Sequence, residues 1–251
     1  MTSIYLDNGP LQHPQRRLSC ENIFNARDLG GLRGDGYMLH YGHIIRGESA
    51  AFTKESDHRY LKNYGLKHIF DLRTVEEAEV VGHGTLVNYR IHSHPLVKSE
   101  EFKNNSISKV SRAVEYQQYF ANSHPVVNKL ILLLNSNSGG VYLHCAVGKD
   151  RTGVITAILL KLLEINDKEI INDYLESKHH IKPIIESLAS FSIYSDFQNV
   201  NWLAQEPVAG NLLPILENLR SPAQRELYLS QADLHPDDIL TLRNLLLRPL
   251  V

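Results

Sequence analysis

Short apolar runs and longer amphipathic stretches alternate along most of the chain. Runs that suit buried β-strands occupy three stretches: residues 66–72, 86–91 and 141–143. Apolar positions three and four residues apart predict helices over three others: residues 54–63, 125–134 and 154–163. The last of these helices is apolar on almost every side and should be buried. Strands that alternate with helices predict an α/β fold, with a central, mostly parallel sheet flanked by helices.

Cap residues mark the ends of several predicted helices. Thr74 predicts the N-terminus of a short helix over 74–80, with Glu76 and Glu77 in its first turn. Further N-caps are predicted at three positions: Thr53, Ser123 and Asn166. A turn at Gly34-Asp35-Gly36 leads into two short apolar stretches, 37–39 and 44–46, which together predict a small antiparallel hairpin.

The remaining segments set the expected domain organisation. Residues 1–19 are polar and contain two prolines, which predicts an extended N-terminal arm. Residues 97–121 form a charged insertion with a helical run over 110–120. From residue 183 onward only helices are predicted, at four places: 183–188, 212–219, 222–229 and 236–247. We therefore expect one domain over residues 1–251, with a helical C-terminal part over 183–251.

Composition narrows the function classes without selecting one. The 251 residues are 43% hydrophobic and 22% charged, which is ordinary for a globular protein with a sizeable core. A net charge of −2 gives no basic excess for nucleic acid, so any anion site must be local. The two cysteines do not suggest a disulfide framework. No apolar run reaches the ~18 residues of a membrane helix, and no basic-then-apolar signal opens the chain, so we expect a cytoplasmic protein, with signal-less export left open.

The strongest chemical signal is the pair Cys145 and Arg151 in the turn between strand 141–143 and the apolar helix. A strand that feeds a helix N-terminus gathers unpaired backbone N–H groups, and the helix dipole adds partial positive charge. Both favour a thiolate at Cys145, which is a nucleophile at neutral pH. The planar guanidinium of Arg151 suits two phosphoryl oxygens.

The residues around this pair fit the same chemistry. Gly148 allows the backbone to approach an anion closely. The hydroxyl of Thr152 is placed to bond the sulfur as it leaves a phosphocysteine, and His144 is expected to orient the cysteine without acting as a base. A buried structural cysteine beside a surface arginine is the commoner arrangement. Residue types, spacing and the strand–turn–helix context together favour the phosphate site here.

The segment His144-Cys145-Ala146-Val147-Gly148-Lys149-Asp150-Arg151-Thr152-Gly153, hereafter the signature loop, resembles that of the cysteine-dependent protein tyrosine phosphatase superfamily. Its Gly-Lys-Asp-Arg-Thr-Gly ending resembles the atypical branch of tyrosine, dual-specificity and phosphoinositide phosphatases. Two further stretches, 25–31 and 69–73 followed by Glu76, match the same branch. The resemblance implies a phosphatase fold and the absence of a cofactor or metal. It also implies phosphate contacts from six residues: Ala146, Val147, Gly148, Lys149, Asp150 and Arg151.

The expected reaction begins with in-line attack of the Cys145 thiolate on phosphorus and proceeds through a phosphocysteine that water hydrolyses. Protonation of the leaving group needs a carboxylic acid. The chain offers Asp150 in the signature loop and Asp71 at the end of strand 66–72, which should lie at the same sheet edge as Cys145. The resemblance favours Asp150. Each aspartate could instead have a purely structural role. Asp150 could brace Lys149 or Arg151, and Asp71 could form a salt bridge to Arg73 or Arg27.

Other polar residues are weaker candidates for a role in the site. The resemblance implies that Arg27 and Asp28 brace neighbouring loops. Arg46 is expected as a surface charge at a strand end, with a role as an accessory of the phosphate site as the alternative. His92 and His94 alternate as metal ligands on a strand would, but no cysteine or carboxylate lies nearby in sequence, so a metal site is not expected. The resemblance also suggests a lid over the site from 97–121, lined by Tyr116, Tyr119 and Phe120. An amphipathic surface helix is the equal alternative there.

Four function classes can be compared on these residues. A P-loop NTPase lacks its first glycine, because Leu143 stands there, and Asp150 follows Lys149 where Ser or Thr belongs. A sulfurtransferase does not explain Arg151 with Thr152. We therefore expect a hydrolase of phosphoprotein or phosphoinositide monoesters that acts on phosphotyrosine, with phosphoserine and phosphothreonine left open as further targets. The non-enzyme alternative is a phospho-binding module that keeps the loop but has little turnover. Lys149 could serve more anionic substrates or simply neutralise Asp150, and the oligomeric state is left open.

Overall fold

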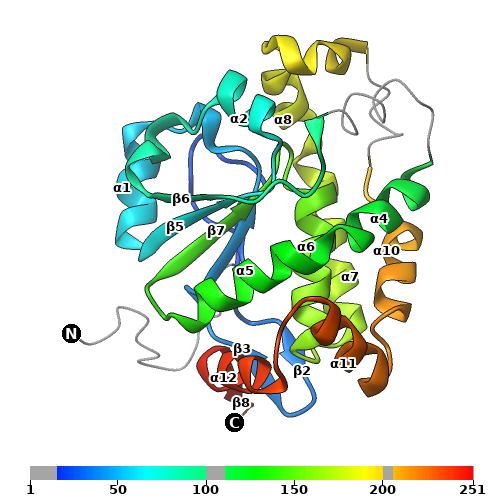
Figure 1. Ribbon diagram of the computed structural model, residues 1–251. Helices are drawn as coiled ribbons and strands as arrows, with labels where there is room; N and C mark the ends of the chain where they lie inside the picture. The colour runs from blue at the N-terminus through cyan, green and yellow to red at the C-terminus, as the bar shows by residue number, and fades with distance from the viewer. Residues whose placement is uncertain (1–15, 100–110, 200–205, 251) are drawn as a thin grey trace.

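A computed structural model describes residues 16–99, 111–199 and 206–250 (Figure 1). Most of the predicted N-terminal arm and the middle of the 97–121 insertion therefore lie outside the described residues. Within the described ranges the protein is an α/β structure whose central sheet is flanked by helices, as the strand and helix alternation predicts.

The central sheet has five strands in the order β1-β4-β7-β5-β6. Their bounds are β1 Arg27–Asp28, β4 Ile44–Gly47, β7 Gly140–His144, β5 Leu66–Asp71 and β6 Arg90–Ser93. β4, β7, β5 and β6 run parallel to their neighbours, and only the short edge strand β1 pairs antiparallel, with β4. The sheet is thus mixed, with its chemistry-bearing strands β5 and β7 adjacent at its centre.

Two predictions about strands are wrong in part. An antiparallel hairpin does form at the predicted turn, but it joins β2 (Arg33–Gly34) to β3 (Tyr37–Leu39), which also pairs with β8 (Leu247–Pro249) in a separate three-stranded sheet. The stretch expected to complete the hairpin is β4, which joins the central sheet. The expected strand over 86–91 begins only at Arg90. The preceding residues form a 3₁₀ helix, η2 (Gly84–Asn88), which buries Leu86 against the sheet.

Ten α-helices surround these sheets in the described residues. Their bounds are α1 Glu55–Asn63, α2 Val75–Val81, α4 Arg112–Ala121, α5 Ser123–Asn135, α6 Asp150–Leu162, α7 Asp167–Glu176, α8 Ile181–Leu188, α10 Ala209–Glu217, α11 Pro222–Gln231 and α12 Pro236–Leu246. Further 3₁₀ helices are η1 Ala50–Phe52, η3 Ser177–His179 and η4 Ser192–Asn199. Of the four predicted helices of the C-terminal part, α8 and α11 extend the predicted runs, whereas α10 both begins and ends earlier than predicted.

Only one of the four predicted N-caps is made by the side chain. The Thr74 hydroxyl accepts from the Glu77 backbone N–H, and the Glu77 carboxylate accepts from the Thr74 backbone N–H. Asn166 holds the cap position of α7 without a side-chain bond. The predictions for Thr53 and Ser123 are wrong by one residue, because Lys54 and Asn122 occupy those cap positions.

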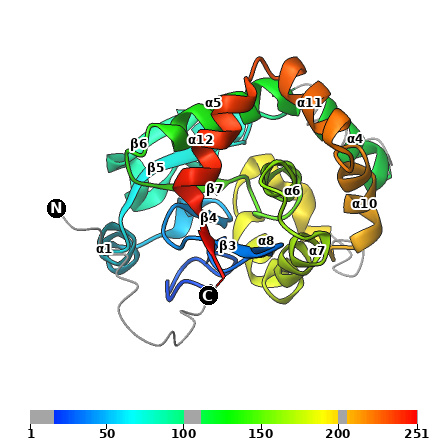
Figure 2. The same cartoon turned by 90° about the horizontal axis from the view of Figure 1, so that it is seen from below.

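The two faces of the central sheet are covered by different helices. Val141 and Leu143 belong to the larger apolar cluster, which includes the buried sides of α5 and α6, whereas Tyr142 belongs to the cluster on the α1 side. Figure 2 shows α5 and α1 on opposite sides of the sheet. Strand β7 is therefore covered on both faces, which explains why its sequence is apolar without alternation.

The C-terminal helices extend the same core. α10 contacts α4 and α6, and α11 and α12 contact α5 (Figure 1). Leu212, Ile215 and Leu242 are fully buried in the larger cluster together with residues of the sheet. The helical part beyond residue 206 thus packs on the side of the sheet that carries α6, the helix after the signature loop.

Candidate active site

The signature loop joins the end of β7 to the first turn of α6, at the C-terminal edge of the central sheet. Strand β5 ends beside it, because Asp71 is in register with His144. This confirms that Asp71 and Cys145 share one sheet edge. Gly148 adopts φ 73°, and a Cβ there would lie 2.3 Å from the backbone of Gly47. Glycine is therefore required at this position by both conformation and space.

Four consecutive carbonyl groups of the loop are bonded on its outer side. Cys145 O accepts from His144 Nδ1 at 3.0 Å, Ala146 O from Ser49 N at 2.9 Å, Val147 O from Asn25 Nδ2 at 3.1 Å, and Gly148 O from Arg46 Nη2 at 2.7 Å. In a planar trans peptide the C=O and N–H groups point in opposite directions. The N–H groups of residues 146–149 are therefore turned toward the inside of the loop, where an oxyanion would be held.

A buried carboxylate, Asp173 of α7, organises this outer side. It accepts from Arg46 Nη1 at 2.7 Å, from Arg27 Nε at 2.9 Å and from Arg16. Arg27 in turn donates to the Asn25 side chain at 2.6 Å, so both Asn25 and Arg46 reach the loop from this cluster. Burial would raise the pKa of Asp173, but the three arginines hold it well below its usual range.

These contacts correct one prediction and support another. Arg46 is fully buried, so its interpretation as a surface charge is wrong: its apolar neighbours in β4 gave no sign of the carboxylate that α7 supplies. Arg27 and Asp28 have the bracing role that the resemblance implies. The Asp28 carboxylate accepts from the backbone N–H of Gly30 and of Gly42, each at 2.6 Å.

Cys145 and Arg151 both lie at the inner side of the loop and are almost completely buried, at 3% and 4% exposure. Arg151 forms a bidentate ion pair with Glu77 of α2, at 2.6 Å and 2.7 Å. Glu77 also accepts from the hydroxyl of Tyr194 in η4 at 2.6 Å. Burial would raise the pKa of Glu77, but Arg151 holds it below its usual value. The pair fixes the plane of the guanidinium beside the cysteine.

Glu77 is the functional residue that sequence reasoning missed. Its only signal was the capping box with Thr74, which accounts for one oxygen at the start of α2 and says nothing about a partner in α6. Arg151 lies 74 residues further along the chain. The ion pair arises because β5 and β7 are neighbours, which brings the segment after each strand to the same place.

The two aspartates named as acid candidates have different surroundings. Asp71 accepts from Arg73 Nε at 3.0 Å on both of its oxygens and from Nη2 at 2.7 Å, so the salt bridge expected as its structural alternative is present, with Arg73 and not with Arg27. Burial would raise the pKa of Asp71, but His144 and Arg73 hold it well below its usual range. Its carboxylate is committed to a neighbouring guanidinium.

Asp150 is the first residue of α6. Its Oδ1 atom lies 3.3 Å from Lys149 Nζ and accepts from the Tyr116 hydroxyl at 2.6 Å. Burial would raise the pKa of Asp150, but Lys149 and then Arg112 hold it below its usual value. Burial also lowers the pKa of Lys149. Lys149 and Asp150 therefore form a close charge pair at the N-terminus of α6.

The residues expected to support Cys145 do not all make the expected contacts. His144 donates from Nδ1 to Cys145 O, and burial lowers its pKa to about 4, so it is neutral at pH 7 and positions the backbone as expected. The hydroxyl of Thr152 is buried and has no hydrogen-bond partner among the described residues, so the expected bond to the sulfur is not made in this structure. Tyr116 and Tyr119 are buried in the larger apolar cluster. Residues 100–110 lie outside the described part, and the lid over 97–121 stays a prediction.

An apolar cover over the loop comes from a different segment. Ala146 and Val147 pack with Ile184, Leu188 and Tyr194, which belong to α8 and η4. Cys145 itself belongs to the larger apolar cluster, which also contains Val97, Tyr116 and Tyr119 of the 97–121 segment.

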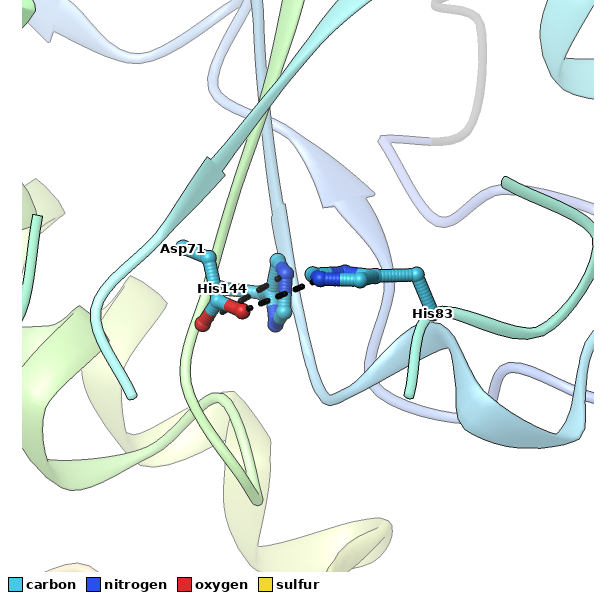
Figure 3. A group of neighbouring side chains, drawn as sticks. All are labelled: Asp71, His83 and His144. Carbon is cyan, nitrogen blue, oxygen red and sulfur yellow. Dashed lines mark ion pairs between the residues drawn. The ribbon is translucent and has the colours of Figure 1, made fainter. Parts of the chain in front are cut away.

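Three possible metal ligands meet beside the loop: Asp71, His83 and His144 (Figure 3). Each imidazole Nε2 lies 3.8 Å from an Asp71 oxygen. The guanidinium of Arg73 already occupies this cluster, because its Nη2 lies 2.7 Å from Asp71 and 3.3 Å from His83 Nδ1. A divalent cation would be placed against that fixed positive charge. The cluster therefore suits a guanidinium and not a metal. Of the two other histidines considered as ligands, His92 has its Nε2 atom 3.0 Å from His68 Nδ1, and His94 stacks on the ring of Phe70.

Comparison with known proteins bears on this geometry. A model of the tyrosine phosphatase family matches residues 18–248. A protein of Cupriavidus necator named as a tyrosine-protein phosphatase is 26% identical over 180 residues, which is 64% of this chain and 62% of that relative. A tyrosine-protein phosphatase of Nostoc commune is 28% identical over 145 residues, or 55% of this chain and 49% of the relative. The chain thus spans less than two thirds of the length of either relative. No described helix has both the length and the apolar character needed to cross a membrane.

Proposed function

The chain belongs to the tyrosine phosphatase family, and we propose that it hydrolyses phosphoric monoesters through a phosphocysteine formed on Cys145. The observation that supports this most directly is the orientation of the loop. Four carbonyls are bonded outward, so four N–H groups face the side where Cys145 and the Arg151–Glu77 pair lie. That arrangement stabilises a phosphoryl group as it is transferred.

In the first step the Cys145 thiolate attacks phosphorus in line. The N–H groups of residues 146–149 and the guanidinium of Arg151 hold the equatorial oxygens while the bond to the leaving oxygen breaks. A carboxylic acid gives its proton to that oxygen, and the product alcohol or phenol leaves. In the second step water attacks the phosphocysteine, the resulting carboxylate takes the proton from the water, and the thiolate departs with release of inorganic phosphate.

Asp150 is the acid in this proposal. Both oxygens of Asp71 are bonded to Arg73, and protonation would leave that buried arginine unpaired. Asp150 is paired with Lys149, and a bound phosphoryl dianion can attract the Lys149 ammonium group away from the Asp150 carboxylate. A dianion placed beside the carboxylate also raises the pKa of Asp150 toward the range in which an acid is useful.

Phosphotyrosine in proteins is the first substrate class to test, because the named relatives are tyrosine-protein phosphatases. The atypical branch, with activity on phosphoserine, phosphothreonine or phosphoinositides, rests on the Gly-Lys-Asp-Arg-Thr-Gly ending of the loop. The 3.3 Å contact between Lys149 and Asp150 supports a neutralising role for Lys149 in the resting enzyme. We also propose that α10 to α12 belong to the catalytic domain, because they share its core.

The test is hydrolysis of p-nitrophenyl phosphate by the wild type and by Cys145→Ser. We expect turnover to fall by at least about 1,000-fold in the variant. Vanadate should inhibit the wild type in competition with substrate. Cys20→Ser is the matched control, because Cys20 lies in the smaller cluster on the α1 side, and it should keep full activity. Near-normal turnover by Cys145→Ser would rule out the proposed nucleophile. A panel of phosphopeptides and phosphoinositides then ranks the substrates.

A further inference from the structure

Helix α4 places a buried tyrosine against the proposed acid. The Tyr116 hydroxyl donates to Asp150 Oδ1 at 2.6 Å, and the Tyr174 hydroxyl of α7 lies 2.7 Å from it. A phenol has a single proton to donate. Because Tyr116 gives that proton to the carboxylate, Tyr174 must donate to Tyr116. The side chain of Asn211 in α10 bonds Tyr174 in turn.

The polar contacts of Asp150 within the described residues fall on one oxygen. Both Tyr116 and Lys149 approach Oδ1. A carboxylate held at Oδ1 by two donors cannot rotate without breaking both bonds, and its proton is directed to the other oxygen, Oδ2. Tyr116 is fully buried and α4 packs on α6, so the donor has a fixed place.

We propose that Tyr116 is a positioning residue for the general acid: it fixes the Asp150 carboxylate so that Oδ2 delivers the proton, and it sets the pH range in which Asp150 is protonated. This rests on the proposed function, with Asp150 as the acid. The hydroxyl stabilises the ionised form of Asp150, so its removal makes protonation easier.

Other charged and titratable groups face Asp150 and stay in place when the Tyr116 hydroxyl is removed. Lys149 and Arg112 act on it as cations, and Tyr119 and Tyr174 are its other titratable neighbours. Glu115 faces Lys149 and bonds both Arg112 and the Tyr119 hydroxyl. Helix α10 contributes the uncharged Asn211. A change seen in Tyr116→Phe is therefore attributable to the Tyr116 hydroxyl, which bonds Asp150 and Tyr174.

The experiment measures the single-turnover rate of phosphocysteine formation against pH, with saturating phenyl phosphate and with saturating p-nitrophenyl phosphate. Phenol is a poor leaving group that needs the acid, whereas p-nitrophenol hardly does. For Tyr116→Phe we expect the alkaline limb with phenyl phosphate to move to higher pH by about half a unit to one unit. Its maximum rate should fall about fivefold because the carboxylate is less well oriented. The rate with p-nitrophenyl phosphate should change less than about twofold.

Two controls use the neighbouring tyrosines. Tyr119→Phe removes a hydroxyl that donates to Glu115, and it should leave the alkaline limb in place. Tyr174→Phe removes the donor behind Tyr116 and should shift the limb in the same direction by a smaller amount. A purely structural role for Tyr116 would lower both rates equally without moving the limb, and that result overturns the proposal.

Asp150→Asn separates this inference from its premise. If that variant loses phenyl phosphate turnover selectively while Tyr116→Phe matches the wild type, Asp150 is the acid and Tyr116 does not position it. If Asp150→Asn affects both substrates equally, the acid assignment fails, and the inference fails with it. The nucleophile assignment depends on Cys145→Ser alone and survives either result.

Discussion

The outer and inner sides of the signature loop hold charge in opposite ways. On the outer side one carboxylate, Asp173, is shared by Arg16, Arg27 and Arg46. On the inner side the cations and carboxylates are matched in pairs, Arg151 with Glu77 and Lys149 with Asp150. The outer groups bond the loop backbone, and the inner groups belong to the proposed phosphate site.

This difference follows from what each side must do. The outer arginines form a scaffold around Asp173 and, through Arg46 and Asn25, keep the loop carbonyls turned away. The inner cations must be available to a dianion and must also be stable without it. Pairing each with a carboxylate removes the cost of an isolated buried charge in the resting enzyme. The outer groups thus set the backbone geometry of the loop, and the inner groups are the ones proposed to contact the phosphate.

The largest effect that tests this comparison is expected for Glu77→Gln. Loss of the bidentate pair frees the Arg151 guanidinium to rotate, and we expect kcat/KM for p-nitrophenyl phosphate to fall about 100-fold. Glu79→Gln is the matched control, because Glu79 is an exposed residue of the same helix and should have no effect. Equal activities in the two variants would show that Arg151 does not depend on its partner.

A smaller effect is expected on the outer side, from Arg46→Met compared with Arg16→Met. Each substitution removes one arginine from Asp173, but only Arg46 reaches the loop, at Gly148 O. Loss of that donor lets the Lys149 N–H turn away, and we expect vanadate to bind about tenfold more weakly. Arg16→Met should change the affinity less than about twofold. If both variants lose affinity equally, the charge of the cluster matters more than the contact with the loop.

The smallest effect on turnover is expected for Asp71→Asn. Activity at pH 7 should stay within about threefold of the wild type if Asp150 is the acid. Stability should fall by about 3 kcal/mol, because Arg73 is left buried without its counter-ion. Urea unfolding followed by fluorescence measures this loss, and a loss of turnover comparable to that of Asp150→Asn would assign the acid to Asp71 instead.

The stability lost in Asp71→Asn should itself depend on pH. The pKa of Asp71 in the folded protein lies below its usual value of 3.8, so its contribution to stability is present above pH 4 and is lost as the unfolded chain takes up the proton at lower pH. The stability difference between wild type and Asp71→Asn should therefore shrink as the pH falls from about 4 toward about 2. A constant difference over that range would show that the salt bridge does not depend on the ionised carboxylate.

Local features of the site were predictable because local residues make them. The buried strand before Cys145, the helix after it, the cap at Thr74 and the glycine at 148 each follow from a few adjacent residues. The shared edge of Asp71 and Cys145 was also predictable, since parallel strands end on the same side of a sheet. The errors lie where local signals conflict with packing. The stretches 37–39 and 44–46 resemble a hairpin, yet pairing with β8 and β7 places them in different sheets.

The sequence by itself determined the strand–loop–helix, and it pointed to Cys145 and Arg151 as the proposed reactive pair, because hydrophobic period and residue type act over a few residues. Only the tertiary structure decided which charges meet: Glu77 with Arg151, Arg46 with Asp173, and Tyr116 with Asp150. Those partners lie 74, 127 and 34 residues apart along the chain. Buried charges must be paired, but a charged residue does not specify its partner until strands and helices are packed.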